Sequence, residues 1–183
     1  YSHKLVGNTW VNADDVGVGN SVKDAAVFSS QLISAYGAGM RVTTDGSSWS
    51  AVATGADALA VMNDRLHRAV VPNNVYTTLV WPAAWSGAIQ VGDSSYPITS
   101  LTAVEQLLVV GRQDGIMATD SEGVTFPLSP ELRFQASSNI ATVKASDVFN
   151  TDLYFRTLTG LIQLSPESGG KTRVGLDMLA SPD

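Results

Sequence analysis

Residues 108–116, Leu-Val-Val-Gly-Arg-Gln-Asp-Gly-Ile, decide the fold class of this 183-residue chain. An apolar run begins at Leu108, the glycine of an Asp-Gly pair follows seven residues later at Gly115, and a large apolar residue, Ile116, comes next. A glycine at this place can take the positive φ of a tight turn, after which the apolar run resumes as a returning strand. The stretch therefore predicts a β-hairpin.

The same pattern occurs in two other parts of the chain. Leu32 is followed seven residues later by Gly39, and Leu153 is followed in the same way by Gly160. Gly160 lies 45 residues after Gly115, a step that is typical of the blades of a β-propeller. We predict that each of these glycines lies in a turn between antiparallel strands, and that the leucine before it is buried.

A shorter copy of the pattern begins at Leu59 and has Asn63-Asp64 at the turn. It is off-centre, because Leu59 lies 27 residues after Leu32 and 49 before Leu108. Either one blade is short, or the match at Leu59 is accidental. Both interpretations stay open at the level of sequence.

The predicted fold class is all-β, a β-propeller or a segment of one with about four blade-like antiparallel units. The best candidate for a helix, residues 51–71, is interrupted by Gly55 and by Asn63-Asp64, and reads better as strand, turn and strand. We assign residues 1–183 to a single domain or fragment, with repeat units at roughly 25–54, 57–80, 100–128 and 143–175.

A second repeated feature follows two of the hairpins. Residues 43–49, Thr-Thr-Asp-Gly-Ser-Ser-Trp, and residues 118–126, Ala-Thr-Asp-Ser-Glu-Gly-Val-Thr-Phe, both run from small polar residues through Asp and Gly to an aromatic. These segments resemble the Asp-box of sialidase-like and photosystem-assembly-like β-propellers. In each segment the glycine is displaced by one residue from the Asp-box pattern, and Phe126 stands where the pattern has Trp.

The resemblance extends over about residues 30–165, and it implies structural roles. It implies that Asp45 and Asp120 bind the backbone amides of their turns, and that Trp49 and Phe126 pack between blades. It says nothing about activity, because the motif lies far from the active sites of propellers. With Gly39, Gly115 and Gly160, these four residues form the predicted set of turn and core positions.

Composition excludes several classes of function. The net charge is −6 and the pI is about 4.7, whereas binding to a phosphate backbone requires a basic surface. The chain has no cysteine, which excludes disulfides and thiolate metal sites, and no apolar run long enough to span a membrane. Charged residues make up only 15%, and polarity is carried by Ser, Thr, Asn and Gly. We therefore predict neither a nucleic-acid partner nor a membrane span.

No set of catalytic residues stands out. Sialidase-like hydrolysis needs a carboxylate pair and three converging arginines. Arg41, Arg112 and Arg156 lie in three different repeats, but Arg41 follows its turn glycine while the others precede theirs, so we predict surface positions. His67 has no second histidine or cysteine nearby and is predicted to be a surface strand residue. We predict neither a metal site nor a cofactor.

The aromatic residues Trp81 and Trp85 lie in a proline- and alanine-containing loop, where they could contact a partner or pack locally. The chain starts at Tyr1 without an initiator methionine and reads as part of a longer one. Together these features predict a non-enzymatic structural or binding module in a larger assembly, with protein subunits as partners. The composition favours a virion or extracellular location, such as a bacteriophage virion or tail. The alternative is a glycoside hydrolase or a carbohydrate-binding propeller domain.

Overall fold

The computed structural model describes residues 2–6, 9–14, 22–120, 122–129, 146–149, 152–157, 160–164 and 171–173. All regular structure in these residues is β-strand, which confirms the all-β prediction. The strands form four antiparallel sheets of four strands and one separate hairpin. Within each sheet the strands are ordered as they are in the sequence, so every strand pairs with its neighbours along the chain.

The first sheet contains β3 (Asp24–Phe28), β4 (Gln31–Ala35), β5 (Met40–Thr43) and β6 (Ser50–Val52). The second contains β7 (Ala58–Met62), β8 (Arg65–Val70), β9 (Asn74–Thr78) and β10 (Ile89–Gln90). The third contains β11 (Ile98–Val104), β12 (Leu107–Arg112), β13 (Gly115–Thr119) and β14 (Thr125–Ser129). The fourth contains β15 (Ser146–Phe149), β16 (Asp152–Thr157), β17 (Gly160–Leu164) and β18 (Lys171–Arg173). The separate hairpin pairs β1 (Ser2–Val6) with β2 (Thr9–Asp14).

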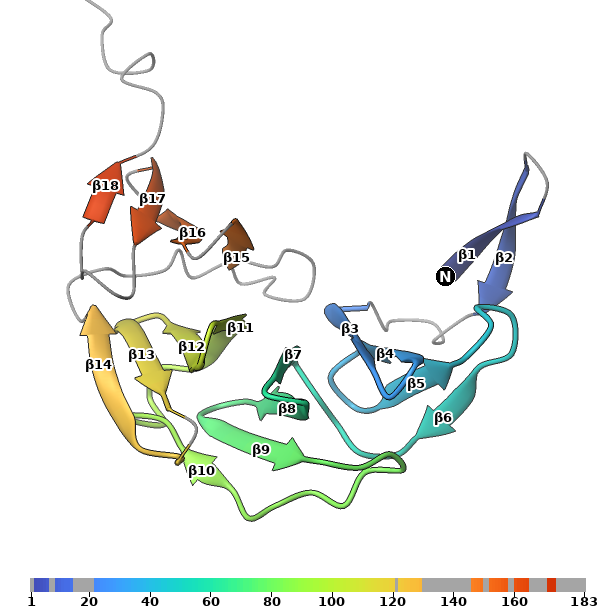
Figure 1. Ribbon diagram of the computed structural model, residues 1–183, viewed down its shortest axis with the longest axis horizontal. Helices are drawn as coiled ribbons and strands as arrows, with labels where there is room; N and C mark the ends of the chain where they lie inside the picture. The colour runs from blue at the N-terminus through green and yellow to red at the C-terminus, as the bar shows by residue number, and fades with distance from the viewer. Residues whose placement is uncertain are drawn as a thin grey trace, which may run out of the picture.

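The four sheets are arranged in an arc, with their first strands on the inside and their fourth strands on the outside (Figure 1). The inner strands pack in sequence order, β3 on β7, β7 on β11 and β11 on β15. One apolar cluster lies between each pair of successive sheets, and burial of this apolar surface holds the sheets together. The arc is open between the first sheet and the fourth (Figure 1).

The structure resolves the uneven spacing of the leucine pattern. Leu59 lies on β7, the first strand of its sheet, whereas Leu32, Leu108 and Leu153 each occupy the second position of a second strand. The residue equivalent to these three is Leu66, the second residue of β8. Leu66 lies 34 residues after Leu32 and 42 before Leu108, so the sequence spacing varies while the strand position is the same, and the match at Leu59 belongs to a different hairpin.

Gly39 lies between the second and third strands of its sheet, as expected, whereas Gly115 and Gly160 already belong to the third strands of theirs. The left-handed residue of the first turn is Gly37, with φ +83°, and not Gly39. Gly115 and Gly160 are the first residues of β13 and β17. The residues between β12 and Gly115 are Gln113-Asp114, so these two residues form the turn.

Candidate functional site

The four equivalent leucines are the clearest guide to a functional surface, because three of them pack against the sheet that precedes theirs. Leu66 belongs to the cluster shared with the first sheet, Leu108 to the cluster shared with the second, and Leu153 to the cluster shared with the third. Their exposed fractions are 0%, 1% and 0%. Leu32 is 38% exposed, so the prediction of a buried leucine is confirmed at Leu108 and Leu153 and is wrong at Leu32.

Leu32 is exposed because, among the described residues, no four-stranded sheet packs on that side of the first sheet. Its cross-strand partner on β3 is Val27, which is 66% exposed. Ala25 and Ala51 point to the same side of the sheet in the register and are also exposed, while Ser34 and Thr43 in the same rows are buried. We call Ala25, Val27, Leu32 and Ala51 the open face.

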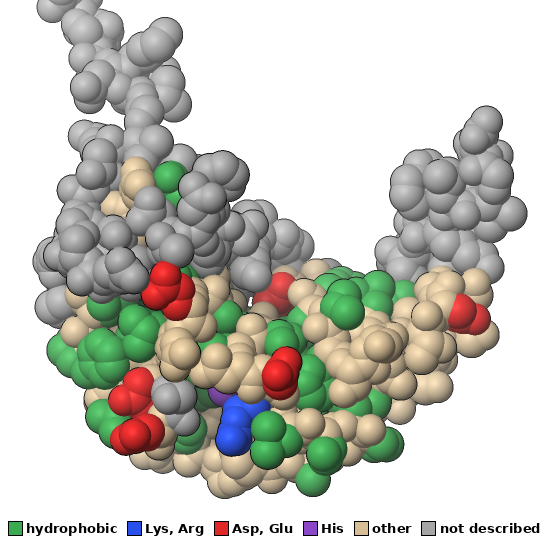
Figure 2. Space-filling model, in the orientation of Figure 1, with side chains coloured by type: hydrophobic (Ala, Val, Ile, Leu, Met, Phe, Trp, Pro, Cys, Tyr) green, Lys and Arg blue, Asp and Glu red, His purple; other side chains and the backbone are tan. Residues whose placement is uncertain are grey.

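The opposite side of the first sheet is fully covered. Ile33, Ala35 and Met40 are inaccessible to solvent and pack with Leu59 and Leu66 of the second sheet. The first sheet is therefore a half-covered sheet at the end of a stack. Hydrophobic side chains gather over β3 and β4 beside the opening of the arc (Figure 2).

The turn between β5 and β6 is held by Asp45. Its Oδ1 accepts hydrogen bonds from the backbone N–H groups of Ser47, at 2.7 Å, and Ser48, at 2.8 Å, and from the hydroxyl of Thr43. The N–H groups of Ser48 and then Ser47 stabilise the carboxylate and hold the pKa of Asp45 below its usual value. The side chain satisfies turn amides that have no strand partner.

Asp120 has the same function in the turn between β13 and β14. Its Oδ1 accepts hydrogen bonds from the backbone N–H groups of Glu122 and Val124, both at 2.9 Å. The two aspartates thus occupy equivalent turns, each between the third and fourth strands of a sheet. The aromatic residues that follow them, Trp49 and Phe126, are only partly buried.

The loop between β9 and β10 carries Trp81 and Trp85, which are partly buried against the apolar cluster between the first and second sheets, here called the first core cluster. The guanidinium of Arg68 lies over the ring of Trp85, 4.6 Å from its centroid, and over the ring of Tyr76 at 4.2 Å. Arg68 also donates a hydrogen bond to the carbonyl of Gly55. Arg68 thus joins the tryptophan loop to residues 53–57, the link that connects the first sheet to the second.

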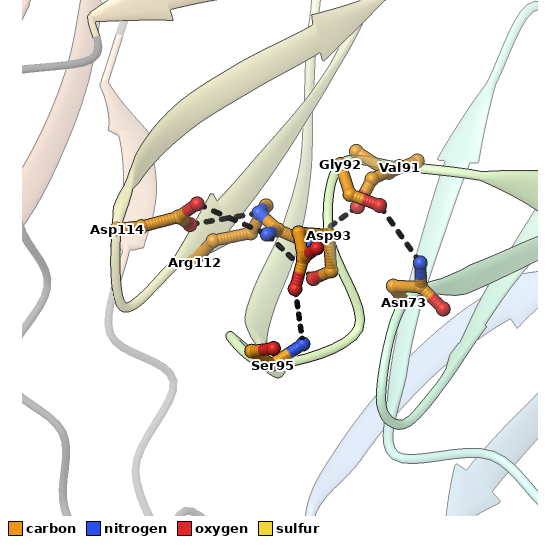
Figure 3. Close-up of polar contacts among 7 residues, drawn as sticks. All are labelled: Asn73, Val91, Gly92, Asp93, Ser95, Arg112 and Asp114. Carbon is orange, nitrogen blue, oxygen red and sulfur yellow. Dashed lines mark hydrogen bonds and ion pairs between the residues drawn. The ribbon is translucent and has the colours of Figure 1, made fainter.

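Arg112 binds residues of the link between the second and third sheets, residues 91–97, in a similar way (Figure 3). Its guanidinium pairs with both carboxylate oxygens of Asp114, at 2.9 and 3.1 Å, and donates to the carbonyls of Val91 and Asp93. The φ of Gly92 is +68°, and a Cβ there would lie 2.6 Å from Cζ of Arg112. The arginine is buried, so the prediction of a surface residue is wrong. Its guanidinium is held by Asp114 and by the carbonyls of Val91 and Asp93.

Two further predictions on charged or titratable side chains have different outcomes. His67 is buried, with 6% of its surface exposed, so its assignment as a surface residue is wrong. The side chain of Arg156 lies outside the described side chains. Sequence reasoning missed Arg68 and the burial of Arg112, and what the two share in the sequence is a position in a second strand.

The fold is similar to that of solved β-propellers. No protein-family model matches the sequence, and no curated protein sequence matches it. The extracellular domain of BT4673, a one-component system of B. thetaiotaomicron, is 15% identical with a TM-score of 0.68 over 93% of this chain and 24% of that chain. BamB from Moraxella catarrhalis is 12% identical with a TM-score of 0.58, over 76% of this chain and 41% of that chain. Virginiamycin B lyase from Staphylococcus aureus is 10% identical with a TM-score of 0.61, over 88% of this chain and 57% of that chain.

These similarities and the arc of four-stranded sheets show a β-propeller-type fold, and at such low identity they show the fold alone. The chain spans about a quarter of the length of the BT4673 domain. In the residues that the structure describes, no helix has the length and apolarity needed to cross a membrane.

Proposed function

We propose that this chain is a non-enzymatic binding module of a larger assembly, and that protein from the assembly covers the open face of the first sheet. The observation that carries the proposal is the exposure of Leu32. The equivalent leucines Leu66, Leu108 and Leu153 are all buried by a preceding sheet. Burial of the exposed apolar side chains of Leu32 and Val27 by a partner would stabilise association.

The partner that fits the open face is another antiparallel β-sheet with apolar side chains on its inner side. Both faces of the second and third sheets are covered in this manner, with apolar clusters on each side. The open face presents aliphatic side chains, and the charged residue in its rows is Arg41, which is partly buried between Ser34 and Ala51. An apolar sheet packs on the aliphatic side chains of this surface.

The setting of the assembly follows from the composition. The net charge is −6, charged residues make up only 15%, and the polar residues are mainly Ser, Thr, Asn and Gly. Together with the fold and the uncovered sheet, this supports a structural component of a bacteriophage virion or tail, or of an extracellular assembly.

Carbohydrate binding is the second candidate, and Trp81 and Trp85 are the side chains on which it depends. Aromatic rings bind sugars through a free face. Arg68 lies over the ring of Trp85, and both tryptophans pack on the first core cluster. The geometry of the open face therefore supports protein binding better than the tryptophan loop supports sugar binding.

The test is sedimentation velocity of the chain at increasing concentration. We expect the chain to associate through its open face, and Leu32→Asp to weaken association by at least about tenfold, because the aspartate would be desolvated in the interface. Leu79→Asp is the matched control, since Leu79 is an exposed leucine in the loop after β9 and should leave association unchanged. A chain that stays monomeric at all concentrations, or equal effects of both variants, would overturn the proposal.

A further inference from the structure

A cleft of about 370 Å³ lies between the second and third sheets. Its walls are partly aliphatic, with Met62 and Ile89 from one sheet and Leu108 from the other. Polar residues line it from the second sheet, His67 and Thr77 on the strands and Asn63 and Arg65 at the turn between β7 and β8. The volume lies within the range of small-molecule sites, and the lining combines three apolar side chains with several polar and charged ones.

His67 and Thr77 form a pair of neighbours. They are directly opposite each other in the register of β8 and β9, so their side chains project from the same face with their Cβ atoms about 4.5–5.5 Å apart. Nε2 of His67 and Oγ1 of Thr77 are both buried, and neither has a hydrogen-bond partner in the described part of the chain. A buried polar atom without a hydrogen bond lowers the stability of a protein. Two such atoms on neighbouring side chains beside a cleft therefore indicate a ligand group that would hydrogen-bond to both.

The protonation state of His67 determines whether the ligand group must donate or accept a hydrogen bond at Nε2. Burial lowers the pKa of His67 to about 4, so the imidazole is neutral at pH 7. It makes a hydrogen bond with the backbone of Met62 that favours the protonated ring, so the imidazole N–H donates to the Met62 carbonyl. Because Nε2 is the atom without a partner, this bond belongs to Nδ1, and Nε2 presents a lone pair.

We propose that this cleft binds a small neutral molecule that carries an alcohol hydroxyl on an aliphatic body. The hydroxyl donates to Nε2 of His67 and accepts from Oγ1 of Thr77, which satisfies both unpaired atoms with one group. The aliphatic body lies against Met62, Ile89 and Leu108. The site lies on the opposite side of the second sheet from Leu66 and the open face, so it is independent of the proposed function.

The rim of the cleft favours a neutral ligand over a charged one. Arg65, Asp120 and Glu122 line it together, and Oδ1 of Asp120 already accepts two turn amides. In Figure 2 a histidine is recessed behind a basic side chain, with acidic side chains to one side. Charges of both signs therefore line the cleft, and Arg65 lies close enough to His67 to act on its pKa, so a ligand of either charge would meet a like charge as well as an opposite one.

The first experiment compares two ligands of nearly equal shape, cyclohexanol and cyclohexanone, by NMR titration of the wild-type chain. Only the alcohol can donate to Nε2, and a hydrogen bond of this kind changes affinity about three- to tenfold. We expect cyclohexanol to bind more tightly by that factor and to shift the ¹⁵N resonance of His67 Nε2. Equal affinities, or no shift with either ligand at its solubility limit, would overturn the proposal.

Two variants locate the site. His67→Phe keeps a planar ring and removes the acceptor, so the preference for the alcohol should disappear. Thr77→Val keeps the shape and should weaken both ligands, because the threonine hydroxyl donates to either oxygen. Thr44→Val, at an exposed threonine outside the cleft, is the control and should change neither. If the alcohol preference survives in His67→Phe, the ligand lies elsewhere and the assignment is wrong.

Discussion

The first and third sheets have the same strand order and the same aspartate-held turn, yet their burial differs. Along β11 six of the seven residues are buried, whereas along β3 only Phe28 is buried. The third sheet has a neighbour on each face, and the first sheet has a full neighbour on one face only. The repeat therefore specifies a strand position, while burial at that position depends on the next sheet in the stack.

The links that lead into the second and third sheets are each held by a buried or partly buried cation. The link that leads into the third sheet is held by Arg112, which joins Asp114 to the carbonyls of Val91 and Asp93. The link that leads into the second sheet is held by Arg68 at Gly55 and by the ion pair of Lys23 with Asp57. In both places a cation on one sheet binds carbonyl or carboxylate oxygens of the adjoining link.

The largest effect is expected from Arg112→Leu, which breaks the fastening of the third sheet. The change leaves Asp114 and two carbonyls without their donor, so we expect the free energy of unfolding to fall by about 3–5 kcal/mol. Chemical denaturation measures this. The exposed Arg65→Leu is the control and should stay within about 0.5 kcal/mol of wild type. A loss below about 1 kcal/mol for Arg112→Leu would show that the link does not depend on it.

The equivalent leucines sharpen the comparison directly. Leu108→Ala creates a cavity between two sheets and should cost about 2–5 kcal/mol in the free energy of unfolding. Leu32→Ala, the same substitution at the same strand position, should cost about 1 kcal/mol or less, because part of the side chain is already in water. Denaturant titrations at a concentration where the chain is monomeric test this. Equal losses would mean that Leu32 is covered in solution.

A further effect is expected from acid at the interface of the second and third sheets. The folded pKa of His67 is about 4 and its ordinary value is 6.5, so between these values the unfolded chain binds a proton that the folded chain does not. Stability should therefore fall as the pH is lowered from about 6.5 to 4, by about 2–3 kcal/mol. His67→Phe should lack this component in a pH series of thermal unfolding. Identical pH profiles for the two chains would contradict the buried neutral imidazole.

The hairpins could be predicted from the sequence because their signals are local. Asn63 and Asp64 both have positive φ and form the two-residue turn that their residue types favour. Asp45 and Asp120 accept the turn amides that the resemblance to an Asp-box implied. The short strand β10 was not predicted, and the unit at 57–80 stops before it, because ten loop residues separate β10 from β9.

The burial of individual side chains could not be predicted, because it depends on sheets that are distant in the sequence. Arg112 reads as a surface arginine beside an Asp-Gly turn, yet the link at 91–93 covers it. His67 reads as a surface residue because it alternates with Leu66 and Arg68, but in an inner sheet both sides of the strand are enclosed. Leu32 matches the sequence pattern of Leu108, but only Leu108 is covered by a preceding sheet in the described part of the chain.

The sequence-ordered pairing of strands has a consequence for how the molecule opens. Every described hydrogen-bonded ladder joins strands that are adjacent along the chain, and successive sheets touch mainly through their apolar clusters. Such a stack behaves as a one-dimensional series of coupled units, in which a unit is stabilised by each neighbour it has. Amide hydrogens of β7 and β11, enclosed between neighbours, should therefore exchange with solvent more slowly than those of β3. A sheet that docks on the open face would remove that gradient by turning an end unit into an internal one.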